Sequence, residues 1–488
     1  VSMWSIVTLH LLAHLSSASR PAFARTSCGT VRGNQLPNGA DEFLGIPFGY
    51  AERFEAPQLR EAPYPQQPFD ATYFGPACLQ TLTSNTTYGK EDCLVMNVWK
   101  PSNATNASSL PVLVYIYGGS NDFGEAEPYN ASQMAVAQNS IIASFNYRVG
   151  PLAFLPFKEQ LAENKSSGNF ALLDMQLALK WVRKEIHHFG GNEATVGIFG
   201  QSSGAGNVEL LTVIPSSNGL FQAAISQSGG LSAMSLEDAL NTTRKIGEKL
   251  NCTQRGYKSL LRCMKETNGD QVVIAQAANC ITPNYCIGLS FGAVIDGILI
   301  PESPKKMLEE GRVNDVHIMY GMNTNDSYLF TRQSYQSLDR KSYIKLVRSM
   351  FKSSERATAA KRALEMYPPL DDPEDNTPVL GWLQSDKELC ATKRLVRMYA
   401  RAGKGRVFLY RYNYWFQSNE TCTAVANYHD SELGSVHQDE VTFVFGKPIY
   451  MNIGYSNCSE PGWAGYSPSC LGCHFNKKVG VFQIGNDN

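Results

Sequence analysis

Short runs of β-branched and aromatic residues alternate with amphipathic stretches along the first half of the chain. These runs predict strands at residues 111–117 (PVLVYIY), 140–147 (SIIASFNY), 195–199 (TVGIF) and 222–226 (QAAIS). An alternation of this kind is typical of a mostly parallel sheet that is covered by helices. The hydrophobic pattern therefore predicts an α/β protein.

A helix is predicted between the second and third of these strands. Its apolar residues, which recur every four to five positions, are Leu173, Leu177, Trp181 and Ile186. The helix is expected to end at residues 189–192 (FGGN), because glycine is common just beyond a helix C-terminus.

The second half of the chain is more helical. Residues 334–403 are charged and helical in pattern, with one Pro/Asp-rich loop at 368–378, and residues 406–414 (RVFLYRYNY) return to a strand pattern. We find no internal repeat in the sequence. One α/β domain with a helical lobe is the simplest organisation.

Composition narrows the choice of function classes. The chain has 488 residues, of which 43% are hydrophobic and 18% charged, with a formal net charge of −1. This is enough apolar material for a large core. Without an excess of basic residues, neither nucleic acid nor an anionic membrane surface is expected as a partner.

The N-terminus has the pattern of an export signal. An apolar run at residues 6–15 precedes small residues, with candidate cleavage sites after Ala18 and Ala24, so residues 1–24 are interpreted as a signal peptide and 25–488 as the domain. The alternative is a helix of the mature protein. The run is too short to span a bilayer, and no membrane insertion is predicted.

Cysteines and glycosylation sequons also favour secretion. There are twelve cysteines, a number that suits an oxidising compartment. Sequons occur at Asn85, Asn103, Asn106, Asn130, Asn164, Asn241, Asn251, Asn419 and Asn457. We therefore expect a secreted protein, or one that resides in the lumen of the secretory pathway.

The candidate nucleophile is Ser202. It stands in Gly200-Gln201-Ser202-Ser203-Gly204, directly after a predicted strand and before small residues that begin a helix. In a nucleophile elbow the turn is so tight that small residues must flank the serine, whose hydroxyl is thereby held clear of the backbone. A Gly-x-Ser-x-Gly motif placed between a strand and a helix indicates such an elbow.

A serine hydroxyl needs a base, and in this arrangement the base follows the serine and an acid along the chain. Two histidines after Ser202 suit this role, His429 and His437. His437 is favoured because it lies in a loop before the apolar run 441–445, whereas His317 falls within a predicted strand.

Two aspartates compete for the acid. Asp326 follows the predicted strand 317–321 at its carboxyl end, where α/β proteins form their sites, while the rival Asp296 also suits a turn. Asp326 lies within the sequon that begins at Asn325. A buried acid there predicts that Asn325 carries no glycan.

Acyl transfer also needs backbone N–H groups directed at the developing oxyanion. The segment Tyr117-Gly118-Gly119-Ser120 follows the first predicted strand and is a candidate source, together with the N–H of Ser203. A simple turn is the alternative interpretation of the two glycines.

Motifs spread along the chain extend these observations. They are residues 43–48 (FLGIPF), 53–54 (RF), 91–98 (EDCLVMNV), 146–148 (NYR), 168–174 (GNFALLD), 189–192 (FGGN), 199–204 (FGQSSG), 321–326 (GMNTND) and 443–446 (FVFG). Together they resemble the type-B carboxylesterase/cholinesterase family of the α/β-hydrolase fold, with near-continuous coverage from Cys28 to Gly446.

The resemblance carries specific expectations for residues of this chain. It implies a catalytic triad of Ser202, Asp326 and His437, and oxyanion donors on Gly119, Ser120 and Ser203. It also implies the disulfides Cys78–Cys93 and Cys252–Cys263, while a pairing of Cys280 with Cys286 is a local hypothesis and the other pairings stay open. A small-molecule ester is the expected partner, with no cofactor and no metal; the oligomeric state is not indicated.

Several positions depart from the family pattern. The acid is Asp where the family mostly has Glu, Gln201 replaces the usual acidic residue, and Ser120-Asn121 replaces the usual Gly-Phe. The Cys78–Cys93 loop lacks the tryptophan with which cholinesterases bind a quaternary ammonium. The loss of both the tryptophan and the acidic neighbour of Ser202 predicts a general carboxylesterase, not a choline-specific one. A loop this short also argues against a large lipase lid.

The C-terminal sequence departs as well. After Gly446 the further helical segment of the family is not found, so the C-terminal part is apparently truncated, and Cys390 resembles a family cysteine whose partner lies in that part. Residues 470–474 (CLGCH) also match the pattern of c-type haem attachment. A disulfide pair beside a histidine is the preferred interpretation of this single copy.

Two functions of different classes follow from the sequence. The first is a carboxylic-ester hydrolase that works through a serine acyl-enzyme. The alternative is a non-catalytic, cholinesterase-like adhesion or binding protein. Such relatives have usually lost the serine or the histidine, and this chain retains Ser202, Asp326 and His437, which favours the enzyme.

Overall fold

In a computed structural model of the chain, most residues from Arg20 onward can be described. The described ranges are 20–81, 85–253, 259–276, 291–335, 337–351, 356–371, 375–413, 435–446 and 479–484. The larger part of the predicted signal, His429, the Cys280–Cys286 pairing and the 470–474 motif lie outside them.

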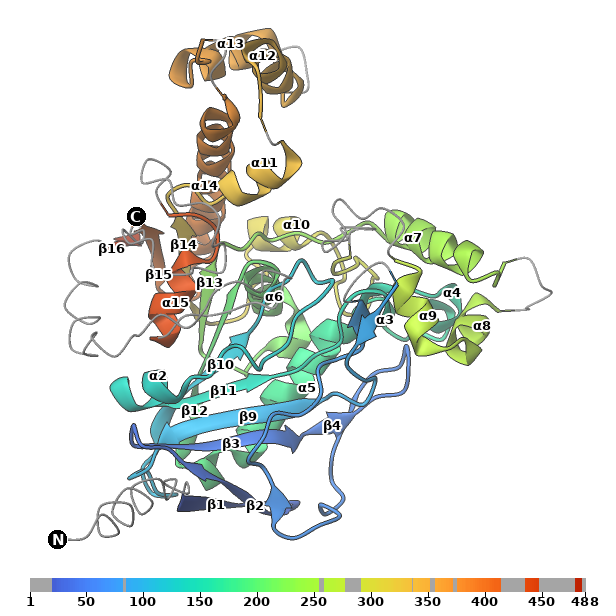
Figure 1. The fold of residues 1–488 in the computed structure, drawn as a ribbon, viewed down its shortest axis with the longest axis vertical. Coiled ribbons are helices and arrows are strands. Elements are labelled where there is room, and N and C mark those ends of the chain that lie inside the picture. Colours follow the sequence, from blue (N-terminus) through green and yellow to red (C-terminus); the bar gives the residue numbers. More distant parts are fainter. Residues whose placement is uncertain are drawn as a thin grey trace, which may run out of the picture.

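The described residues form one large sheet that runs through the molecule (Figure 1). Eleven strands follow one another in the order β1 (Arg20–Thr26), β2 (Gly29–Gln35), β3 (Ala40–Pro47), β9 (Val95–Pro101), β11 (Ile141–Phe145), β10 (Leu110–Ile116), β12 (Gly191–Gln201), β13 (Ala223–Gln227), β14 (His317–Asn323), β15 (Val407–Tyr412) and β16 (Val479–Ile484), and β6 (Phe69–Asp70) pairs with β2. From β11 to β15 the neighbours are parallel, and the flanks of the sheet are antiparallel except for β6, which runs parallel to β2.

This architecture confirms the predicted mostly parallel sheet. The apolar runs of the sequence form its centre, and all five residues of β11 are buried, as expected for a parallel strand covered on both faces. Helix α5 (Phe170–Glu185) is the predicted helix between β11 and β12. The short helix η1 (Ile186–Phe189) extends it and ends at Gly190, whose φ is 89°.

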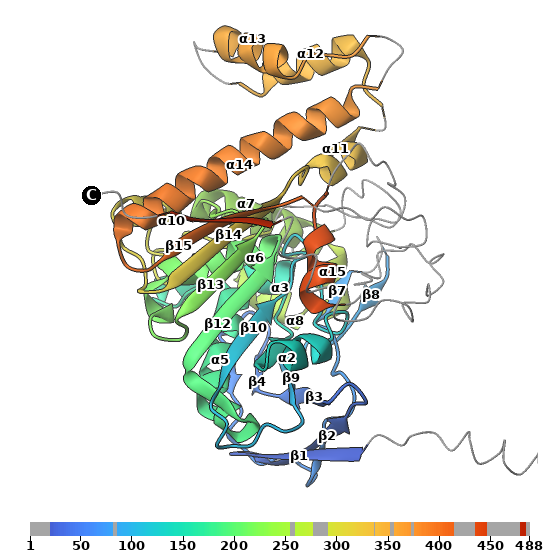
Figure 2. The same cartoon turned by 90° about the vertical axis from the view of Figure 1, so that its left-hand side faces the viewer.

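Helices cover both faces of the sheet. Figure 2 shows α5 on one side, with α2 (Ser132–Ala137) and α15 (Asp439–Phe445) on the other. Helix α6 (Ser203–Val213) follows β12 directly. The apolar run at residues 441–445 is thus the body of α15, and it packs Phe445 edge-on against Tyr115 of β10 at 4.9 Å between ring centroids.

The predicted helical lobe is also present. Figure 1 shows α12 (Arg340–Ser349) and α13 (Arg356–Met366) at the far end of the long helix α14 (Thr377–Ala402), away from the sheet. The lobe has its own apolar cluster, which includes Leu338, Tyr343, Val347 and Leu380. Helix α11 (Tyr328–Ser334) leads from the sheet into this lobe.

Strand β1 begins inside the segment interpreted as a signal. Residues 20–24 pair with β2, and Ala22 and Ala24 are buried. The division into a signal and a domain stays a prediction. Within the described residues, no helix is both long and apolar enough to cross a bilayer.

The structure contains both disulfides that the resemblance implies, Cys78–Cys93 and Cys252–Cys263. In the described part of the chain, Cys28 is buried and Cys390 exposed, and neither forms a disulfide there.

A buried ion pair ties the region before α3 (Pro151–Phe154) to α5. Arg148 donates from Nε and Nη2 to both carboxylate oxygens of Asp174, at 2.8 and 2.7 Å. The two side chains are 6% and 0% exposed. Arg148 also donates to the backbone carbonyl of Glu55 at 2.9 Å. The charge pair is therefore fully enclosed and joins three segments of the chain.

Candidate active site

Ser202 stands in a tight turn between β12 and α6. Its φ of 58° and ψ of −129° are unfavourable for a residue with a side chain. A Cβ at Gly200 would lie 2.7 Å from the carbonyl of Gly204, and one at Gly204 would lie 2.2 Å from the carbonyl oxygen of Ile116. Only glycine fits either place, which explains the Gly-x-Ser-x-Gly spacing and gives the turn the geometry of a nucleophile elbow.

Asp326 and His437 are hydrogen-bonded although 111 residues separate them in sequence. His437 Nδ1 contacts Asp326 Oδ1, and both side chains are almost fully buried. The other carboxylate oxygen of Asp326 accepts from the backbone N–H of Asn323 at 2.8 Å and from the hydroxyl of Ser228. The carboxylate is thus held in place from three directions and fixes the imidazole ring.

The rival candidates lie elsewhere. Asp296 accepts from the backbone N–H groups of Ile298 and Ile300, both at 3.0 Å, so it stabilises a turn. His317 begins β14 and accepts from the backbone N–H of Arg406 at 3.0 Å. Neither residue lines the cavity that contains Ser202.

The charges around His437 favour its protonated form. Burial acts to lower its pKa, but the charge and hydrogen bond of Asp326 and the charges of Glu440 and Glu388 outweigh burial, so the pKa is raised. Burial and the charge of Asp326 likewise raise the pKa of Glu440 to about 7. Partial desolvation raises the pKa of Glu388, although this side chain is open to the cavity.

The second ring nitrogen of His437 faces the elbow. His437 Nε2 lies 3.1 Å from the side-chain nitrogen of Gln201, the residue before Ser202. The ring also packs against Phe330, at 4.9 Å between ring centroids. Because Nδ1 is engaged by Asp326, Nε2 is the nitrogen that can take a proton in a reaction.

The loop after β10 passes beside the elbow with an unusual backbone. Gly119, Ser120 and Asn121 have φ values of 120°, 57° and 62°, and the N–H of Asn121 donates to Ser203 Oγ at 3.1 Å. Among the described residues, no hydrogen bond occupies the N–H groups of Gly119, Ser120 or Ser203. These groups are therefore available to a ligand.

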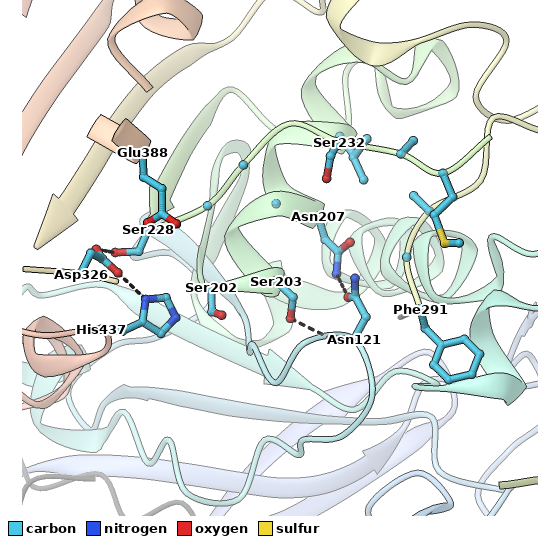
Figure 3. A pocket seen from close by; sticks show the side chains of 18 of the residues that line it. Asn121, Ser202, Ser203, Asn207, Ser228, Ser232, Phe291, Asp326, Glu388 and His437 are labelled. Carbon is cyan, nitrogen blue, oxygen red and sulfur yellow. Dashed lines mark hydrogen bonds and ion pairs between the residues drawn. The ribbon is translucent and has the colours of Figure 1, made fainter. Parts of the chain in front are cut away.

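The elbow of Ser202, the loop after β10 and the His437–Asp326 pair border one cavity of about 490 Å³. Figure 3 shows Ser202 at its centre, with His437, Asp326, Ser228 and Glu388 to one side. Ser203, Asn121 and Asn207 lie on the other side, and Phe291 borders the far end. The cavity is thus large enough for a small ligand that reaches Ser202.

Sequence reasoning did not identify Ser228, Glu388 and Asn207 as parts of this site. Ser228 holds Asp326 from a loop after β13, 98 residues earlier in the chain. Its φ of 54° is the only local anomaly, and a sequence does not display it. Within the described residues there is also no group of three or more His, Cys, Asp or Glu that could hold a metal ion.

Comparison with known proteins assigns the family. Residues 20–460 match the sequence model of the Carboxylesterase family. The chain is 30% identical to bile salt-activated lipase of Rattus norvegicus over 450 residues, which cover 86% of this chain and 70% of the lipase. It is 30% identical to acetylcholinesterase of Bungarus fasciatus over 465 residues, 88% of this chain and 74% of that enzyme.

A solved structure of PNB esterase superposes with a TM-score of 0.67 at 27% identity, covering 87% of this chain and 85% of the esterase. The fold is that of the α/β-hydrolases. The chain belongs to the carboxylesterase family, and its family relatives indicate an enzyme that hydrolyses esters.

Proposed function

We propose that this protein is a general carboxylic-ester hydrolase that works through an acyl-enzyme on Ser202. The observation that carries the proposal is the buried pairing of His437 Nδ1 with Asp326, next to a cavity that also contains the strained elbow of Ser202. A serine, an oriented imidazole and free backbone donors are the parts that acyl transfer requires.

In the first step, Ser202 Oγ attacks the acyl carbon and His437 Nε2 takes the hydroxyl proton. The oxyanion accepts hydrogen bonds from the N–H groups of Gly119, Ser120 and Ser203. Collapse of this intermediate breaks the bond to the alcohol oxygen, which receives the proton from His437. Water then attacks the acyl-enzyme with His437 again as base, which releases the acid and restores Ser202.

The surroundings of the Cys78–Cys93 disulfide support a preference for general over choline esters. The described residues between the two cysteines form a hairpin of β7 (Gln80–Thr81) and β8 (Thr87–Tyr88). The only aromatic residue between the two cysteines is Tyr88, which is exposed and hydrogen-bonded to Glu125 at 3.0 Å. None of the described residues that line the cavity is a tryptophan, so the usual ring for a quaternary ammonium has no counterpart there.

Hydrolysis of p-nitrophenyl acetate and butyrate by the purified full chain tests the proposal. We expect turnover that is abolished in Ser202→Ala, and covalent labelling of Ser202 by an organophosphate identified in the tryptic peptide. Choline esters should be hydrolysed no faster than uncharged esters of the same acyl group. A folded protein with neither turnover nor label would favour the non-catalytic adhesion protein.

We also propose passage through the secretory pathway. Two disulfides support it, because such bonds persist in oxidising compartments. Apart from the buried Asn325, the sequon asparagines of the described region are exposed or half-buried: Asn85, Asn103, Asn106, Asn130, Asn164, Asn241 and Asn251. Expression in a secreting cell line, followed by recovery of glycosylated protein from the medium, tests this assignment.

A further inference from the structure

One wall of the cavity is built from two side-chain amides. Asn207 follows Ser203 by four residues on α6, so both side chains project from one face of the helix. Asn207 Nδ2 donates to Asn121 Oδ1 at 2.9 Å, and the N–H of Asn121 donates to Ser203 Oγ at 3.1 Å. We call Asn121, Ser203 and Asn207 the amide wall.

The amide wall has hydrogen-bonding groups that the protein leaves unused. Among the described residues, none accepts from Asn121 Nδ2 or from the hydroxyl of Ser203, and none donates to Asn207 Oδ1. Asn207 is only 1% exposed, yet it lines the cavity. Asn121 is half-buried and also lines the cavity, so the free atoms of the two amides can be reached from it. A ligand that enters the cavity can therefore pair with them in place of water.

The geometry of the proposed reaction assigns this wall to the acyl group. His437 must protonate the leaving oxygen, so the alcohol lies on the side of His437. Figure 3 shows Ser202 between His437 and the amide wall, which leaves the opposite side for the acyl chain. Ser203 and Asn207 are about 6 Å apart along the helix axis, so the wall spans the first four to five bonds of such a chain.

The charge of the cavity limits which acyl groups can bind. Its described lining contains the carboxylates of Asp326 and Glu388 but no lysine or arginine. An anionic acyl group would therefore be repelled. The free groups of Asn121 and Ser203 are donors, and they suit a neutral oxygen that accepts hydrogen bonds.

We propose that the amide wall binds a neutral oxygen in the acyl chain, so that esters of short ether-, keto- or hydroxy-bearing acids are preferred over plain alkanoates. This inference rests on the proposed esterase activity. It names a substrate class for the same site and a role for Asn121 and Asn207 in selecting it.

Paired esters of equal size test the inference. The p-nitrophenyl ester of 3-methoxypropanoate is compared with the pentanoate, and that of 4-methoxybutanoate with the hexanoate, so that one oxygen replaces one methylene. The quantity measured is the ratio of kcat/KM for the ether to kcat/KM for the alkanoate. Because each variant acts on the same two esters, differences in their intrinsic reactivity cancel between wild type and variant.

Asn207→Leu is of similar size and removes the hydrogen bond that orients the Asn121 amide. It should lower this ratio about fivefold in at least one pair, because Asn121 Nδ2 is then no longer held toward the ether oxygen. Asn121→Gly removes the donor while tolerating the φ of 62°, and it should lower the ratio similarly. Met234→Leu, which alters an apolar part of the lining, is the matched control and should leave the ratio unchanged.

The outcomes separate the two proposals. If the wild type hydrolyses no ester and Ser202 takes no organophosphate label, the esterase proposal fails. If the wild type and both variants are labelled and give the same ratio of kcat/KM for the ether to that for the alkanoate, the amide wall does not select the acyl group. The esterase proposal then stands without it. Far-ultraviolet circular dichroism identifies a variant that has not folded, and the other variant then decides.

Discussion

The side-chain nitrogen of Gln201 lies 3.1 Å from His437 Nε2, the ring nitrogen that receives the proton of Ser202 in the proposed mechanism. When His437 is neutral and its Nδ1–H is donated to Asp326, Nε2 carries a single lone pair. An amide N–H of Gln201 that donates to this lone pair competes with the hydroxyl of Ser202. An acidic residue, which is usual in the family at this position, has no such donor when ionised.

Replacing Gln201 should therefore speed acylation. Gln201→Met removes the donor at similar size, and we expect the rate of organophosphate labelling of Ser202 and kcat/KM to rise about 2- to 10-fold, the effect of one neutral hydrogen bond. Gln201→Glu should instead move the acid limb of kcat/KM to higher pH, since a carboxylate favours the imidazolium. A fall in kcat/KM for Gln201→Met with an unchanged pH profile would contradict competition and indicate that the amide orients the ring.

The pH dependence of hydrolysis should reflect the raised pKa of His437. The base is active only when Nε2 is unprotonated, so activity is lost as the pH falls through this pKa. Since the pKa is raised, the acid limb of kcat/KM is expected above pH 6.5, the ordinary value for histidine.

Glu388→Gln provides the matched variant for this pH profile. It removes one of the charges that raise the pKa of His437 and should move the limb to lower pH by roughly 0.2–0.7 unit, given the usual strength of exposed charge pairs. A limb that does not move, or moves upward, would show that Glu388 does not act on His437 through its charge.

The enclosed Arg148–Asp174 pair should be important for stability. Asp174→Leu leaves the guanidinium buried without its partner, and we expect the free energy of unfolding to fall by about 3–5 kcal/mol in urea denaturation. Arg244→Ala, which breaks the exposed pair with Glu248 on α7 (Leu236–Lys249), is the control and should cost less than about 0.5 kcal/mol. Equal losses in the two variants would argue against a special contribution of the buried pair.

Glycan mapping offers a test of the site that requires no enzyme assay. Asn325 is 0% exposed, and its side-chain oxygen accepts from Ser385 Oγ at 3.1 Å. We expect an unmodified Asn325 in protein secreted from eukaryotic cells, with glycans at exposed sequons such as Asn103 and Asn164. A glycopeptide that carries sugar on Asn325 would be incompatible with the packing around Asp326.

The sequence predicted the central strands, α5 and the elbow because their signals are local. The run PVLVYIY and the glycines around Ser202 specify β10 and the turn without reference to the rest of the chain. The contact of Ser228 with Asp326 and that of Gln201 with His437 were not predictable, since each joins segments that only the folded sheet brings together. For α15 the apolar run was recognised, but a run this short has no periodicity that identifies a helix.

Three residues with side chains that line the cavity, Asn121, Ser202 and Ser228, adopt positive φ, and so does Ser120, the neighbour of Asn121. A positive φ costs a residue with a side chain of order 1–3 kcal/mol. The cost is smaller for asparagine and is absent for glycine. The proposed active site is thus a locally unstable region, and the remainder of the sheet must offset its cost. Stability and activity therefore impose opposite demands on this region. A glycine at Ser120 or Ser228 would relieve backbone strain and raise the stability of the fold. The same change would make the predicted oxyanion loop at Ser120 more mobile, or remove the hydroxyl of Ser228 that holds Asp326.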